Sequence, residues 1–282
     1  MPLIFAVATL FLVACSPKVP QDIRIATTTS VQNSGLMDYL RPAFREHSGL
    51  DLLVHSAGSG RALQLLENGE ADLVISHAPL TEERLLAQHP DWSYRKFAHN
   101  RFVVVGPVAD PAGIASAGDV IDAFQRIADS GARFVSRGDQ SGTHEREETL
   151  WTLAGRRPSG DRLIVSGRGM AQALRHANEA AGYTLTDEPT FWQLRDQLQL
   201  TSLFAADARL QNTYALIAPG NNQRAAVFVR WLAPDEGMGR VGSFTIGGKR
   251  AYEPWPIDCP GARPADRPCQ PGSSGTEGSR DR

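Results

Sequence analysis

The chain has 282 residues, of which 41% are hydrophobic and 21% are charged, and its formal net charge is -2. This length is enough for a sizeable hydrophobic core in one or two domains. The nearly balanced charge excludes a bulk electrostatic attraction to nucleic acid. Any selectivity for an anion must therefore come from local geometry and not from the field of the whole protein.

The N-terminal stretch is almost wholly apolar up to Cys15. It is shorter than the roughly 20 residues that span a bilayer, so we interpret residues 1–14 as a lipoprotein signal peptide. Leu12-Val13-Ala14-Cys15 resembles a bacterial lipobox, in which the cysteine becomes the lipidated first residue. No Lys or Arg precedes the apolar run, and an uncleaved anchor is the alternative. Both interpretations place the body outside the cytoplasm, with residues 15–22 as a tether.

Strand and helix patterns alternate through the first half of the chain. Apolar stretches that end at glycine or at small hydroxylated residues predict strands at residues 23–26, 50–54, 71–75 and 102–107. Apolar residues spaced three and four apart predict helices at residues 35–47 and 59–68. This alternation indicates an α/β fold with a largely parallel sheet.

The strand at residues 102–107 ends at Gly106-Pro107, and we interpret it as the first crossing between two lobes. The segment that follows carries predicted helices and strands at residues 117–129, 144–153, 167–181 and 182–187. A predicted strand at residues 214–218 returns the chain to the first lobe, and a predicted helix at residues 225–232 covers that strand. The predicted lobe 1 is therefore residues 23–105 plus 214–252, and the predicted lobe 2 is residues 106–213.

The C-terminal composition shifts to Pro, Gly, Ser, Asp and Arg with almost no aliphatic residues. Such a segment buries too little apolar surface to order itself, so residues 256–282 are predicted to be a disordered tail. The tail contains Cys259 and Cys269, which are the two cysteines left if Cys15 is acylated. An exported protein permits a disulfide between them, and the sequence leaves this pairing open.

Three loops share small hydroxylated residues and glycine: residues 26–30, 57–60 and 136–144. Each follows a predicted strand and leads into a helical pattern, which directs free backbone N–H groups to one place. Arg137 adds a guanidinium fork that suits a fully ionised oxyanion. The candidate ligand-binding residues are Thr28, Thr29, Ser59, Gly60, Arg137, Ser141, Gly142 and Thr143.

Several motifs in fixed order carry a family resemblance: residues 26–30, 58–63, 68–72, 135–139 and 183–187. Over roughly residues 23–252 the chain resembles the substrate-binding protein of tungstate ABC transporters. The resemblance implies a two-lobed periplasmic binding protein of the type II, Venus-flytrap kind, with two crossover strands. It implies capture of tungstate or molybdate and delivery to an ABC permease, with no enzymatic activity, no cofactor and no metal beyond tungsten in its oxyanion.

From this we also expect a monomer that does not bind nucleic acid and that a lipid on Cys15 holds to the periplasmic side of a membrane. One departure from the family pattern matters: Glu188 follows Asp187 where a basic residue is frequent. A new carboxylate near the cleft would oppose a dianion. Tungstate and molybdate are dianions at neutral pH, so their site needs donors alone, which backbone N–H groups, hydroxyls and Arg supply.

Two other functions remain open on these residues. A phosphate or other protonated oxyanion benefits from a carboxylate acceptor, and Asp139 either takes that part or orients Arg137. A surface hydrolase would use Asp139, Ser141 and His144 as a triad. The hydrolase is disfavoured because the segment lacks the first glycine of the G-x-S-x-G elbow, and because triad members normally meet from distant positions.

Overall fold

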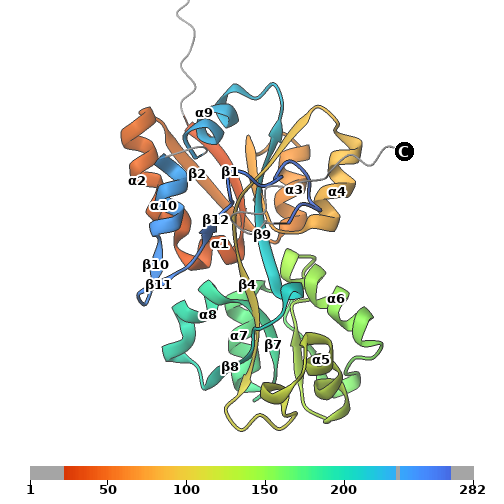
Figure 1. Cartoon of the computed structure of the whole chain (residues 1–282). Coiled ribbons are helices and arrows are strands. Elements are labelled where there is room, and N and C mark those ends of the chain that lie inside the picture. The colour runs from red at the N-terminus through yellow and green to blue at the C-terminus, as the bar shows by residue number, and fades with distance from the viewer. Residues whose placement is uncertain (1–21, 233–235, 268–282) are drawn as a thin grey trace, which may run out of the picture.

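The structure is a computed structural model that describes residues 22–232 and 236–267. Two lobes lie end to end, and the long strands β4 and β9 run between them (Figure 1). The predicted signal peptide, Cys15 and nearly all of the tether lie outside the described residues, as does the tail from residue 268. Among the helices of the described part, none has the length and apolarity to cross a membrane.

Lobe 1 is built on a mixed sheet. In spatial order its strands are β12 (Glu253–Pro254), β4 (Trp92–Pro107), β9 (Gln211–Pro219), β3 (Leu73–Ser76), β1 (Asp22–Thr28) and β2 (Asp51–Ala57). Strands β1, β2 and β3 are parallel, but β9 is antiparallel to β3 and β4 is antiparallel to β9. The predicted largely parallel sheet is therefore wrong for this half, because strands that leave and re-enter a lobe run in opposite directions.

Helices cover both faces of the lobe 1 sheet. They are α1 (Thr29–Ser34), α2 (Leu36–Ser48), α3 (Ser59–Glu67), α4 (Pro79–Gln88), α9 (Gln223–Leu232) and α10 (Glu236–Ser243), with a small hairpin of β10 (Thr245–Ile246) and β11 (Lys249–Arg250). Side chains alternate along β1, so that Ile23 and Ile25 belong to one hydrophobic cluster and Ala26 to the other. The sheet is thus buried on both sides.

Lobe 2 is arranged around the second half of β4. Its elements are α5 (Val120–Asp129), β5 (Phe134–Ser136), α6 (Gly142–Ala154), β6 (Leu163–Val165), α7 (Gly169–Glu179), β7 (Thr184–Asp187), α8 (Glu188–Leu194) and β8 (Leu200–Phe204). Along β4, Phe102 and Val104 face one hydrophobic cluster while Val103 and Val105 face the other. The continuous apolar run therefore fits a strand buried on both faces.

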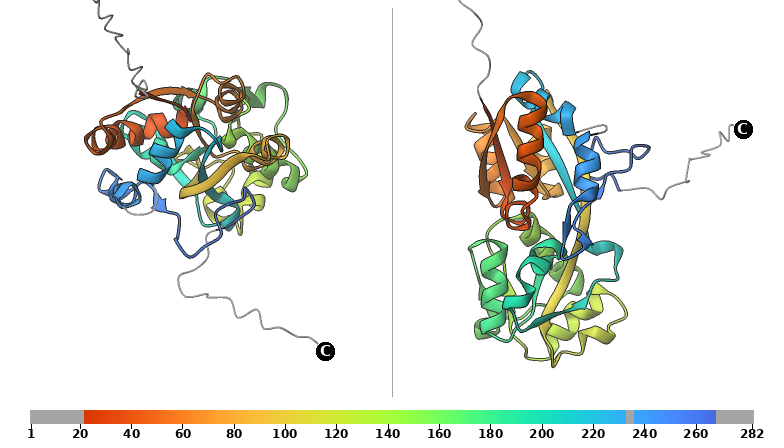
Figure 2. Two further views of the ribbon diagram at one scale, coloured as in Figure 1. Left: turned by 90° about the horizontal axis from the view of Figure 1, so that it is seen from above. Right: turned by 90° about the vertical axis from the view of Figure 1, so that its left-hand side faces the viewer.

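Strand β4 changes partners at one point. It pairs with β9 up to Arg101, and from Phe102 onward it pairs with β7 and then with β8. The change comes before the boundary at residue 105 that the sequence predicts. An apolar run looks the same at the end of one sheet as at the start of another, so hydrophobicity does not mark the point where the partner changes. In Figure 2, right, β4 runs the length of both lobes.

The first part of the C-terminal segment lies against lobe 1. The buried Lys96 donates from Nζ to the carbonyl of Pro264 at 2.8 Å and also to the carbonyl of Asp266. The Lys96 backbone N–H donates to Gly261 at 2.8 Å, and Cys259 is buried and disulfide-bonded. Composition predicts disorder from residue 256, but residues 256–267 supply the acceptors that a buried ammonium needs.

Candidate functional site

Each of the three predicted loops joins the end of a strand to the start of a helix. Thr28 ends β1 and caps α1, where its Oγ1 accepts from the Val31 N–H at 3.4 Å. Ser59 is the first residue of α3. Ser141 caps α6, and its Oγ accepts from the His144 N–H at 3.2 Å. Thr28 and Ser141 therefore cap helices, alongside any role in binding.

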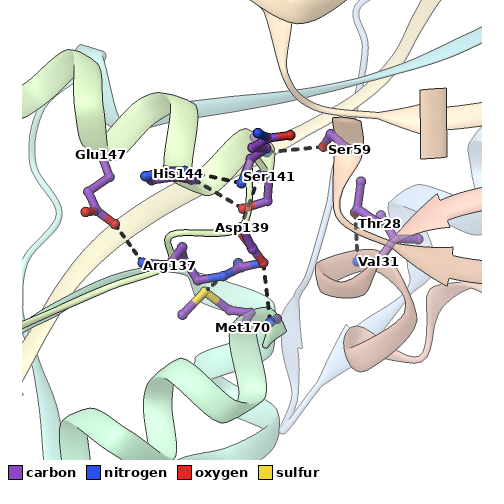
Figure 3. A network of polar contacts seen from close by, with 12 residues as sticks. Thr28, Val31, Ser59, Arg137, Asp139, Ser141, His144, Glu147 and Met170 are labelled. Carbon is purple, nitrogen blue, oxygen red and sulfur yellow. Dashed lines mark hydrogen bonds and ion pairs between the residues drawn. The ribbon is translucent and has the colours of Figure 1, made fainter. Parts of the chain in front are cut away.

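The loops of the two lobes touch one another (Figure 3). The Gly142 N–H in lobe 2 donates to Ser59 Oγ in lobe 1 at 3.2 Å. A Cβ on Gly142 would lie 2.2 Å from the carbonyl oxygen of His77, so the two lobes come this close only because residue 142 is glycine. Gly60 also lies close to the Gln140 carbonyl, but a Cβ there would be 3.3 Å from the oxygen, a milder contact than the one at Gly142.

Thr29 and Thr143 complete the predicted set. Thr29 begins α1 and its side chain faces Gly169 at the start of α7, where a Cβ would meet the Thr29 methyl at 3.3 Å. Thr143 is fully buried in the first turn of α6. The structure thus brings residues from β1, α3 and α6 to one place between the lobes, as the three-loop pattern predicts.

Arg137 is fully buried, and its guanidinium has few partners. Its Nη2 donates to Asp139 Oδ2 at 2.6 Å, and Nη1 lies 3.3 Å from the sulfur of Met170. Within the described residues its Nε has no hydrogen-bond partner. A buried cation needs acceptors for its donors, and one carboxylate plus one thioether is a small complement for a guanidinium.

Asp139 accepts from several donors at once. Besides Arg137, the N–H groups of Ser141 and Gly169 donate to its carboxylate, each at 3.3 Å. Burial raises the pKa of Asp139, but the adjacent Arg137 and the hydrogen bonds from Ser141 lower it further, so its pKa lies below the ordinary value. The carboxylate is therefore ionised at neutral pH, and its oxygens are already directed at protein donors.

Other buried donors near the site also lack partners among the described residues. Like the Arg137 Nε, the hydroxyls of Thr27 and Thr143 are buried and have no hydrogen-bond partner in this part of the chain. Leaving a buried polar group unsatisfied costs about 1–3 kcal/mol, so this set calls for an acceptor rich in oxygen. Sequence reasoning did not select Thr27, although it stands inside the hydroxylated motif, because only the fold shows that its side chain is buried.

Two further titratable groups that the sequence did not single out surround the site. His77 is buried, with Nδ1 3.0 Å from Asn212 Oδ1, and burial together with the nearby Arg137 lowers its pKa to about 3. Asp187 is fully buried at the start of α8, where its Oδ2 accepts from the Thr190 N–H at 3.0 Å, and burial raises its pKa. His77 is therefore neutral at pH 7 and adds no positive charge.

Glu188, the departure from the family pattern, is the first residue of α8. Burial raises its pKa, while the nearby Arg101 and Lys249 oppose that shift. Two cations thus stand close to this carboxylate. Its charge is partly balanced by Arg101 and Lys249, which reduces its opposition to a dianion.

The triad of Asp139, Ser141 and His144 is not assembled. Ser141 Oγ accepts from the backbone of His144, whereas the ring of His144 accepts at Nδ1 from the Gln140 N–H at 3.2 Å. The other ring nitrogen lies 3.5 Å from a carboxylate oxygen of Glu148. A nucleophile must meet its base through a side-chain hydrogen bond, so this geometry gives a hydrolase no support.

Two α/β lobes joined by crossover strands, with buried donors where they meet, define a periplasmic binding protein. Residues 16–236 match the family model described as "PBP superfamily domain". The tungstate-binding protein TupA of Peptoclostridium acidaminophilum is 35% identical over 82% of this chain and 82% of its own length. The chain therefore belongs to the PBP superfamily and, within it, to the family of the tungstate-binding protein TupA.

Two solved structures share the fold. The tungstate ABC transporter structure from Geobacter sulfurreducens has a TM-score of 0.72 and 34% identity, covering 79% of this chain and 98% of that one. The tungstate-binding protein TupA from Desulfovibrio alaskensis G20 has a TM-score of 0.67 and 33% identity, covering 83% and 99%. These are families of binding proteins and not of enzymes, so Ser141 and His144 lose their catalytic interpretation.

Proposed function

We propose that this chain captures tungstate between its two lobes for an ABC transporter, with molybdate as an alternative cargo. The observation that carries the proposal is the buried guanidinium of Arg137, whose Nε has no partner in the described part of the chain. Family membership supports the same ligand, because three relatives that share about a third of the sequence carry tungstate in their names.

The chemistry of the site fits a fully deprotonated anion. Its members offer N–H and O–H donors: Arg137 Nε, the hydroxyls of Thr143 and Thr27, and the start of α6. Each charge-assisted hydrogen bond contributes about 1.5–3 kcal/mol, and a helix N-terminus adds about 0.3–2 kcal/mol. A few of these together reach a tight site before the cost of ordering the two lobes is subtracted.

A phosphate ligand has less support. Phosphate keeps a proton at neutral pH and needs an acceptor, for which Asp139 is the candidate. That carboxylate already accepts from Arg137, Ser141 and Gly169. We therefore assign Asp139 the role of orienting Arg137, and the site then favours fully deprotonated oxyanions over phosphate, which keeps a proton. Tungstate and molybdate have nearly the same size and charge, and these contacts do not separate them.

Closure around the anion is a hinge motion in this proposal. We place the first hinge between Arg101 and Phe102, where β4 exchanges partners, and the second at the start of β9, which pairs Gln211 with Arg101. Lobe 1 is then residues 22–101 with the described chain from Gln211 to Arg267, and lobe 2 lies between. The sequence-based prediction instead places the two crossings at residues 105 and 213.

The protein works outside the cytoplasm, as periplasmic binding proteins do. We further propose that residues 1–14 are a signal peptide, that Cys15 carries the lipid, and that the monomer delivers the anion to a membrane permease. Stable anchoring takes more than one acyl chain. Mass spectrometry of the native protein tests the lipid on Cys15 directly, since an unmodified cysteine in a cleaved or uncleaved chain contradicts it.

The proposal is tested by calorimetry on residues 16–282 with tungstate, molybdate, sulfate and phosphate. We expect tungstate and molybdate to bind and Arg137→Ala to weaken both by at least tenfold, about 1.4 kcal/mol. Arg61→Ala is the matched control, because among the described residues the exposed Arg61 side chain bonds only to Gln64 within its own helix. No heat with tungstate, or normal binding by a folded Arg137→Ala variant, would contradict the proposal.

A further inference from the structure

The carboxylate of Glu145 connects the two lobes away from the proposed anion site. Glu145 belongs to the first turn of α6 in lobe 2, yet its oxygens reach the start of α4 in lobe 1. Oε1 accepts from the Leu80 N–H at 2.8 Å. Oε2 accepts from the Thr81 N–H at 3.1 Å and from the Thr81 hydroxyl at 2.8 Å.

Helix α4 lacks a cap of its own for these donors. Its N-cap residue is Ala78, which has no polar side chain, and Pro79 follows. Glu82 within the helix accepts from the Ala78 N–H at 2.8 Å and from the Tyr94 hydroxyl at 3.0 Å, and no hydrogen bond joins it to the N–H groups of Leu80 or Thr81 among the described residues. The first N–H groups of a helix have no partner inside the helix, so Leu80 and Thr81 depend on Glu145 for theirs. The lobe 2 carboxylate is thus the cap of a lobe 1 helix.

The same helix carries the proposed anion donors. Gly142 and Thr143 lie in the first turn of α6 together with Glu145, and the Glu145 N–H donates to the Ser141 carbonyl at 2.9 Å. Movement of Glu145 toward α4 therefore carries Gly142 and Thr143 toward lobe 1. The hydrogen bonds that the structure shows for the Glu145 side chain all go to Leu80 and Thr81.

We propose that Glu145 is an affinity-determining latch that holds the lobes together around the anion without touching it. Its three hydrogen bonds exist only while α6 lies against α4, so they stabilise the closed form. The apparent affinity of a ligand that needs the closed form rises with the fraction of molecules in that form. The inference rests on the proposed anion capture, and it predicts an equal contribution to every anion that the closed site accepts.

The test is the binding of tungstate and molybdate to the purified Glu145→Ala protein. We expect both dissociation constants to rise by the same factor, at least about fivefold, with their ratio unchanged. Thr81→Val, which removes one of the three donors, should show a smaller rise. Glu148→Ala is the matched control on the same helix, because its carboxylate pairs with Arg157 within lobe 2 at 3.0 Å.

Unchanged affinity in Glu145→Ala would overturn the latch, and so would a loss confined to one of the two anions, since that would indicate direct contact. If the wild type binds neither anion, the proposed function fails. The latch can then still be tested by small-angle scattering, which measures the radius of gyration of each protein. The Glu145→Ala protein must then be more expanded than the wild type and the Glu148→Ala protein. Equal radii of gyration would refute it.

Discussion

Asp139 and Arg137 form a close ion pair, with 2.6 Å between Oδ2 and Nη2. The guanidinium is fully buried, and the same carboxylate also accepts from the N–H groups of Ser141 and Gly169. The pair therefore fixes the guanidinium with respect to α6 and α7. Because Nη2 is engaged and Nε is not, Arg137 retains a donor for the anion.

Asp139→Asn separates the two roles of this carboxylate. If Asp139 orients Arg137, the substitution should weaken tungstate and phosphate binding by similar factors, roughly threefold to tenfold, because a charged hydrogen bond becomes a neutral one. Calorimetric competition between the anions measures both. Selective loss of phosphate binding with tungstate binding intact would show instead that Asp139 accepts a ligand proton.

Gly142→Ala should block closure. The added methyl group would lie 2.2 Å from the His77 carbonyl oxygen across the interface between the lobes, and neither is a flexible side chain. We expect tungstate affinity to fall at least tenfold, or about 1.4 kcal/mol, while the melting temperature changes little. Gly239→Ala is the control, since a Cβ there meets nothing within 4 Å. Normal binding by folded Gly142→Ala would show that this contact is not needed for capture.

Glu147→Gln should change how stability depends on pH. Burial raises the pKa of Glu147 from 4.5 to about 7, so the folded protein keeps a proton that the unfolded chain releases. The contribution of Glu147 to stability is full below its ordinary pKa and is lost as the pH rises through the folded value. A glutamine does not titrate, so the stability of the variant does not fall in this way as the pH rises.

Its free energy of unfolding relative to the wild type should therefore rise between about pH 5 and about pH 7, by at most about 1.4 kcal/mol per pH unit. Urea unfolding at several pH values measures the difference. A difference that stays constant across this range, or that falls with pH, would rule out a buried, protonated Glu147 beside the Arg137 backbone, to whose N–H it is bonded at 3.0 Å.

Lys96→Met should loosen the C-terminal segment. The variant loses the hydrogen bonds to the Pro264 and Asp266 carbonyls and the contact of Nζ over the Trp255 ring, 4.9 Å from its centroid. We expect stability to fall by about 2 kcal/mol and protease to cut the segment faster. Tungstate affinity should stay within about twofold, since Lys96 is no part of the proposed site. Unchanged proteolysis would show that Lys96 does not hold the segment.

Local signals in the sequence predicted much of the fold and the meeting of the three loops. The strands that lead into the loops at residues 26–30 and 136–144, and the helices that follow them, were readable because apolar periodicity and capping residues act over a few positions. Arg137 stood out as a cation among small hydroxylated residues. These features need no knowledge of distant parts of the chain.

What the sequence left out depends on contacts between distant segments. The exchange of partners in β4 at Phe102 is invisible in an apolar run that is buried on both faces. Glu145 accepts from Leu80, which lies 65 positions away, and no local sequence pattern around either residue predicts this contact. The order in the C-terminal segment likewise depends on Lys96, whose burial only the folded sheet creates.

The position of bound tungsten tests most directly the claim that the anion is captured between the two lobes. Anomalous diffraction from crystals of the protein with tungstate locates tungsten without reference to the protein density. We predict one strong site between the lobes, with the oxyanion in hydrogen-bonding reach of Arg137 Nε and the Thr143 hydroxyl. Tungsten bound elsewhere on the chain, or absent from crystals grown in excess tungstate, would contradict the account.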